Sequence, residues 1–77
     1  LIQRGSMAFI GVVINITALS VGGSNPVTII SLIAAIWAAG IASNFRAHPQ
    51  DIPSYAALLG IGSLIVGTIM LIVGAAS

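Results

Sequence analysis

The side chains that could carry out chemistry are gathered in one stretch of this chain, "SNFRAHPQDIPSY", residues 43–55. The stretch contains Arg46, His48 and Asp51, whereas the whole chain has only two Lys or Arg residues, one Asp and one His. A His–Asp pair belongs to many catalytic triads, and His also binds metals. The stretch therefore has three interpretations: a reactive site, a turn between membrane helices, or a surface along which something passes.

The residue types around this pair argue against an enzyme. The sequence has no Glu, Lys or Cys, so neither a triad nor a metal site can be completed around His48 and Asp51. Pro49 lies between them and forces a turn rather than a helix face. We expect no catalytic residue, no metal and no cofactor. His48 is then a solvated turn residue, with a pH-sensitive contact as the alternative.

The composition is that of a membrane-type chain. Hydrophobic residues make up 58% and charged residues 4% of the 77 residues, and the mean hydropathy is +1.21. A soluble domain carries about 25% charged residues, and a chain this short buries only about 60% of its surface. The excess apolar surface must face lipid or identical neighbours. The net charge of +1 predicts no electrostatic binding of nucleic acid.

Three apolar segments predict an all-helical domain that covers residues 1–77, with helices at about 6–21, 27–43 and 53–76 and a polar loop at 44–52. The first break, "GGSNP", has two glycines that suit a helix end. Ser24 or Asn25 can cap the next helix, and Pro26 fits its first turn. Before the third helix, Asp51 is expected to place its carboxylate near the positive end of the helix dipole.

Segment length indicates which helices can cross a membrane. At 1.5 Å per residue the third segment spans about 33 Å and the second about 26 Å, against a hydrocarbon core of about 30 Å. These two segments predict a hairpin of long apolar helices. The first segment is shorter and carries Asn15, Thr17 and Ser20. It has three interpretations: a short span, a helix on the membrane surface, or the leading arm of a kinked helix that continues into the second segment.

Small residues recur at helical spacing on each segment and predict close helix packing, within one chain or between copies. Trp37, about two turns before the loop, is expected in packing or in a subunit contact, and Tyr55 at the membrane interface. If all three segments cross, Arg4 and Arg46 lie on one side, which is the cytoplasmic side by the positive-inside rule. The small residues are Ala8, Gly11, Asn15, Ala18 and Gly22; Ser31, Ala35, Ala38 and Ala42; Ala56, Gly60, Ser63, Gly67 and Gly74.

The segments "IISLIAAIWAAGIASNFR" and "YAALLGIGSLIVGTIMLIVGAAS" resemble the mature pilins of conjugation-type type IV secretion systems. That family includes bacterial T-pilins, F-like pilins and related archaeal DNA-import pilins. The shared features are a Trp in the helix before the loop, a short Arg-bearing loop and a Gly-rich final helix. The likeness begins near Ile30 and continues to the C-terminus.

The resemblance implies a function and a partner set. Such pilins are cleaved from precursors, wait in the membrane as hairpins, and assemble with phospholipid into helical filaments on the cell surface, through whose lumen DNA is thought to travel. Arg46 would meet headgroup phosphate, and Asn44, His48 and Gln50 would line the lumen. Small-residue positions, with Ala38, Ala42, Gly60, Ser63, Gly67 and Gly74 chief among them, would form subunit contacts, and exposed Ile and Leu would pack against acyl chains.

Two other functions remain open from the sequence. One is a small accessory transmembrane subunit of a larger respiratory or photosynthetic complex, and the other is a small transport or toxin–antitoxin membrane peptide. The proton-carrying ring subunit of rotary ATP synthases is rejected, because that mechanism needs a carboxylate in the middle of a membrane helix. The single carboxylate of this chain, Asp51, lies in the loop.

Overall fold

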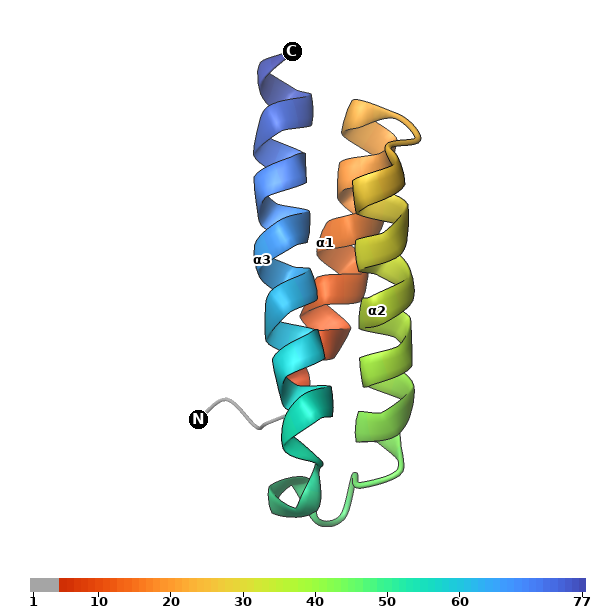
Figure 1. Cartoon of the computed structure of the whole chain (residues 1–77), viewed down its shortest axis with the longest axis vertical. Coiled ribbons are helices and arrows are strands. Elements are labelled where there is room, and N and C mark those ends of the chain that lie inside the picture. The colour runs from red at the N-terminus through yellow and green to blue at the C-terminus, as the bar shows by residue number, and fades with distance from the viewer. Residues whose placement is uncertain (1–4) are drawn as a thin grey trace.

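The chain folds into a bundle of three helices, seen in a computed structural model that describes residues 5–77 (Figure 1). Helix α1 spans Ser6–Gly22, α2 spans Pro26–Ser43 and α3 spans Ser54–Ala76, with a short 3-10 turn, η1, at Pro49–Asp51. No β-strand occurs within the described residues, so the predicted all-helical class is confirmed. Helices α1 and α3 run parallel, and α2 runs antiparallel to both (Figure 1).

The first segment is a separate helix and not the leading arm of α2. The chain turns back at Gly23, whose φ of 81° is in the region that glycine tolerates best. The Asn25 side chain accepts a hydrogen bond of 2.8 Å from the Val27 N–H, and Pro26 is the first residue of α2. Of the two candidate caps, Asn25 is therefore the one that acts, and the kinked-helix interpretation is wrong.

Loss of this cap should destabilise the bundle modestly. Asn25→Ala should lower the free energy of unfolding by about 1 kcal/mol, because the N–H groups of the first turn of α2 lose their acceptor. Unfolding from mild detergent into SDS can be followed by the labelling rate of a cysteine introduced at the fully buried Ala35, in a chain without other cysteines. Ser24→Ala is the control and should change the value by less than about 0.5 kcal/mol. Equal effects of the two variants would contradict the assignment.

The third helix begins after a break that separates it from Asp51. Asp51 is the exposed last residue of η1, and Ile52 and Pro53 follow in extended conformation, with ψ of 128° and 142°. The first turn of α3 contains no acidic residue. Asp51 thus lies three residues before the first residue of α3, and the expected proximity of its carboxylate to the α3 dipole stays a prediction.

The packing is inverted relative to a water-soluble bundle. Apart from Ile52, the buried hydrophobic residues are all alanines, and the buried polar residues are Asn15, Thr28, Ser31 and Ser63. Large apolar side chains lie on the outside of all three helices, as Val13, Ile30 and Ile72 illustrate with exposed fractions of 63%, 67% and 63%. In soluble proteins such side chains fill the core. The fold therefore places small residues where helices meet and large apolar residues toward the surroundings.

Helices α2 and α3 are long and apolar enough to cross a membrane, judged by length and composition. Helix α1 is apolar but shorter, with 17 residues. The predicted pattern of two long apolar helices with a short N-terminal one is therefore present. The start of α1 lies at the same end of the bundle as the loop between α2 and α3, whereas the turn between α1 and α2 and the C-terminus lie at the other end (Figure 1). Arg4, predicted to share a side with Arg46, falls outside the described residues.

Helices α1 and α3 approach closely along their whole shared length. A Cβ atom built at Gly60 would lie 3.1 Å from the Ala8 Cβ, and one built at Gly74 would lie 2.8 Å from the Gly22 Cα. The facing pairs keep a constant difference in residue number, as expected for parallel helices in one register. The pairs are Ala8 with Gly60, Gly11 with Ser63, Asn15 with Gly67, and Gly22 with Gly74.

Candidate functional site

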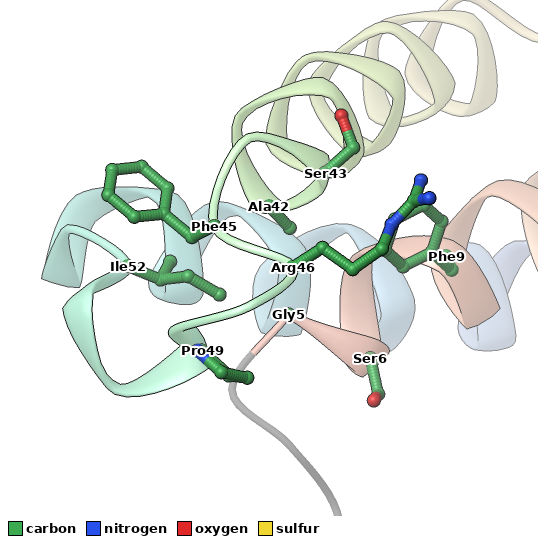
Figure 2. A pocket seen from close by; sticks show the side chains of 9 residues that line it. All are labelled: Gly5, Ser6, Phe9, Ala42, Ser43, Phe45, Arg46, Pro49 and Ile52. Atoms are coloured by element: carbon green, nitrogen blue, oxygen red, sulfur yellow. The ribbon is translucent and has the colours of Figure 1, made fainter.

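A small cavity lies at the end of the bundle that carries the polar loop. Its volume is about 70 Å³, and residues from the start of α1, the end of α2 and the loop form its walls. Figure 2 shows the Arg46 side chain extending from the loop toward the side on which Phe9 of α1 lies. The lining residues are Gly5, Ser6, Phe9, Ala42, Ser43, Phe45, Arg46, Pro49 and Ile52.

Local backbone hydrogen bonds shape the loop that carries Arg46. The Asn44 N–H donates to the Ile41 carbonyl (3.1 Å) and ends α2, and the His48 N–H donates to the Phe45 carbonyl (3.0 Å). Pro49 then begins η1, where the lack of an N–H costs nothing. Arg46 thus lies in a tight turn, between the end of α2 and η1.

The inner wall of the cavity is packed closely. Ile52 is 4% exposed and lies in one cluster with Ala42 and Ala56. A Cβ atom built at Gly5 would lie 2.7 Å from the Ala42 Cβ and 3.0 Å from the Ile52 Cδ1. A glycine at position 5 therefore allows the start of α1 to close this side of the cavity.

The electrostatics of the cavity suit an anion with an apolar attachment. Arg46 is exposed. Its guanidinium offers five N–H donors in a planar fork that matches the oxygens of a phosphate. Phe9 and Ile52 supply apolar surface on the same cavity. The arrangement can therefore bind a phosphate group while an attached hydrocarbon remains on apolar surface.

The structure brings only one of the predicted loop residues to this cavity. Arg46 lines it, whereas Asn44, His48 and Gln50 are exposed on the same loop and are not among its lining residues. All four nevertheless lie at one end of the bundle. They form the polar end of a molecule whose sides are apolar.

The predicted packing residues lie between helices of one chain. Ala38, Ala42, Gly60, Ser63 and Gly67 are buried, and Gly74 is half-buried against Gly22. The resemblance implied that these small residues form contacts between subunits. Because they are already covered within one chain, a contact between copies would have to use the large exposed side chains. Trp37, which is 62% exposed, is one of these.

Two parts of the arrangement were missed by sequence reasoning. Gly5, Ser6 and Phe9 complete the cavity beside Arg46. They lie far from Arg46 in the sequence, and no local pattern links them to it. Asn15 was grouped with the small residues although it is a polar side chain in an apolar helix. Such residues commonly bond to a neighbouring helix, so that signal was present.

Asn15 is the centre of a buried polar cluster. Its Nδ2 donates to the Gly11 carbonyl (2.7 Å) and to the Ser63 carbonyl (3.1 Å), and the Ser31 Oγ donates to the same Ser63 carbonyl (3.1 Å). The Asn15 side chain is completely buried, and its Oδ1 has no hydrogen-bond partner. One side chain each from α1 and α2 therefore meets one carbonyl of α3.

Helices α2 and α3 enclose an apolar groove on the outside of the bundle. Its volume is about 490 Å³, and Tyr55 lies among its lining residues, near the polar loop. The groove is large enough for a hydrocarbon chain or for side chains of another protein. The other lining residues are Ala34, Leu58, Leu59, Gly62, Ser63 and Val66.

Across residues 5–77 no group of three or more His, Cys, Asp or Glu side chains is placed to hold a metal ion. No protein-family model, no curated protein and no solved structure matches this chain. The function is therefore argued from the geometry of the chain and from the resemblance described above.

Proposed function

We propose that this chain is a structural pilin subunit that assembles with phospholipid into a conjugation-like filament used for DNA transfer or import. The observation that carries the proposal is the inverted packing, with small residues inside and large apolar residues outside. An exposed apolar surface of this extent marks contact with lipid or with other protein. A filament of identical subunits and lipid would cover it on every side.

The hydroxyl groups on the outside support an apolar environment. Thr17, Ser20 and Thr68 are exposed, and each donates to the carbonyl four residues earlier in its own helix, at 2.8, 3.2 and 2.8 Å. In a medium without water, polar groups must be satisfied within the protein. These hydroxyls need no water, so they are compatible with hydrocarbon or with a dry subunit contact.

The polar end and the apolar sides fit the two parts of a phospholipid. Arg46 beside its cavity would bind the headgroup phosphate, and the groove between α2 and α3 would hold an acyl chain. Tyr55 lies in the groove near the loop and has the aromatic and hydroxyl character typical of membrane interfaces. Headgroups would then lie at the polar end of the bundle, and acyl chains along its apolar sides.

The charge of the chain suits passage of DNA without specific contacts. The loop offers Arg46 as its cation, and the net charge of the whole chain is +1. Sequence-independent DNA binding rests on several Lys or Arg contacts to phosphates. A lumen lined by Asn44, His48 and Gln50 and by lipid headgroups would instead let DNA slide. Before assembly the subunit would reside in the cell membrane, and afterwards in a filament outside the cell.

Electron microscopy of the purified full chain, mixed with phospholipid, tests this function. We expect long tubes of uniform diameter. Isolation from cells at one copy within a complex of different proteins, with no tubes formed from the purified chain, would contradict the proposal and favour an accessory membrane subunit.

A further inference from the structure

We infer that Asn15 fixes the position of the α1–α2 pair along α3 and thereby holds the start of α1 against Ile52, which closes the cavity beside Arg46. The observation behind this is the shared acceptor on α3. Asn15 Nδ2 and Ser31 Oγ, from two different helices, both lie 3.1 Å from the carbonyl oxygen of Ser63. All three residues are buried, so water does not compete for these bonds.

The Ser63 carbonyl is accessible to Asn15 because Gly67, one turn further along α3, has no side chain. A Cβ atom built at Gly67 would lie 2.7 Å from the Asn15 Nδ2 and 2.8 Å from its Cγ and Oδ1. The hydroxyl of Ser63 is held by a hydrogen bond of 2.9 Å that it donates to the Gly60 carbonyl. Asn15 therefore requires a glycine opposite it.

This requirement restricts sliding of α1 on α3. A shift by one turn would place Asn15 against Ser63 in one direction and against Met70 in the other. Each of these residues has a side chain that would occupy the space Asn15 fills opposite Gly67. A shift by a whole heptad would present Gly60 in one direction and Gly74 in the other. The first shift would carry the start of α1 past the first residue of α3 and away from Ile52, and the second would carry the end of α1 past the end of α3 at Ala76. The remaining α1 residues in this contact, such as Ala8 and Gly11, are too small to restrict sliding in the same way.

The connections between helices do not fix this position by themselves. The turn at residues 23–25 ties α1 closely to α2, so these two helices move together. The loop at residues 44–53 is longer and can follow a shift of about 5.4 Å, the rise of one helical turn. A single buried Asn sets register in coiled coils by the same combination of polar bonding and steric exclusion.

The consequence reaches the cavity at the end of the bundle. Gly5 lies against Ala42 of α2 and against Ile52 just before α3, with built Cβ distances of 2.7 and 3.0 Å. A one-turn shift would separate Gly5 from Ile52 and open the cavity of about 70 Å³. Asn15 is thus a positioning residue for the Ile52 wall of this cavity, and the importance of the cavity rests on the proposed function.

Cysteine cross-linking of the full chain in phosphatidylcholine vesicles tests the inference, because the sequence has no cysteine of its own. Ala8→Cys is combined with Gly60→Cys to report the observed position, since these Cβ atoms lie near disulfide distance. Combination with Ala56→Cys or Ser63→Cys reports shifts of one turn. The measured quantity is the yield of the first cross-link divided by the yields of the other two.

Asn15→Ala should lower this ratio about three- to tenfold, the range expected for loss of one interhelical hydrogen bond. Ser31→Ala should lower it less but in the same direction. Thr17→Ala removes a hydroxyl bonded only within α1 and should change the ratio less than about twofold.

An unchanged ratio in Asn15→Ala would overturn the inference. Loss of helix content in Asn15→Ala, seen by circular dichroism, would also overturn it, because Asn15 would then serve folding rather than position. Neither readout depends on filament formation, so failure of the proposed function would be seen separately.

Discussion

Gly67→Ala should lower the free energy of unfolding by about 1 to 3 kcal/mol, the range for adding a methyl group to a closely packed contact. The added Cβ would lie 2.7 to 2.8 Å from three side-chain atoms of Asn15. Asn15 is fully buried and held by two hydrogen bonds, so it cannot turn aside without losing them. The labelling rate of a cysteine at Ala35 during unfolding in SDS measures the change.

Gly62→Ala is the matched control on the same helix. A Cβ atom built at Gly62 meets nothing within 4 Å, so this variant should be neutral or up to about 1 kcal/mol more stable, since Ala favours helices over Gly. The change from Gly to Ala should thus lower the free energy of unfolding at Gly67, and should leave it unchanged or raise it at Gly62. Equal destabilisation by both variants would show that helix flexibility, and not contact with α1, explains the effect. The double variant Asn15→Ala with Gly67→Ala should recover part of the loss.

Arg46→Gln should impair filament assembly or change the lipid that the filament selects, because it removes the guanidinium that lines the cavity. Loss of a charge-assisted bond to phosphate costs about 1.5 to 3 kcal/mol, or roughly ten- to hundredfold in affinity. The yield of filaments and the headgroup composition of their lipid are the measurements. Arg46→Glu should have a larger effect, since it places an anion beside the phosphate.

Gln50→Glu is the matched control for charge. It lowers the net charge by one, as Arg46→Gln does, but Gln50 lies on η1 and does not line the cavity. Its filaments should keep the lipid composition of the wild type. A similar defect in both variants would point to net charge or topology as the cause. Normal assembly of Arg46→Gln with unchanged lipid would count against a headgroup site at Arg46.

Helix positions and the buried stripes follow from local sequence signals. Apolar runs, two glycines and Pro26 mark the elements within one or two residues, because helix ends depend on nearby residues. The small residues repeat at steps of three and four, and the structure buries Ala8, Gly11 and Ala18 accordingly. These features need no knowledge of distant contacts.

The features that sequence reasoning missed depend on distant contacts. The cavity beside Arg46 joins Gly5 and Phe9 to a loop more than thirty residues later, through packing that no local pattern encodes. Whether the small residues pack within a chain or between chains was open in the sequence, and the bundle places them within one chain.

The phospholipid content of purified filaments tests the central claim most directly, namely that lipid and identical neighbours cover the large apolar side chains. Filaments would be separated from free vesicles by density, and phosphate would be measured against protein mass. We predict a fixed, stoichiometric amount of phospholipid per chain. This amount should persist after extensive washing and should not increase when more lipid is supplied. Filaments free of phospholipid, or with a content that varies from one preparation to the next, would contradict the account.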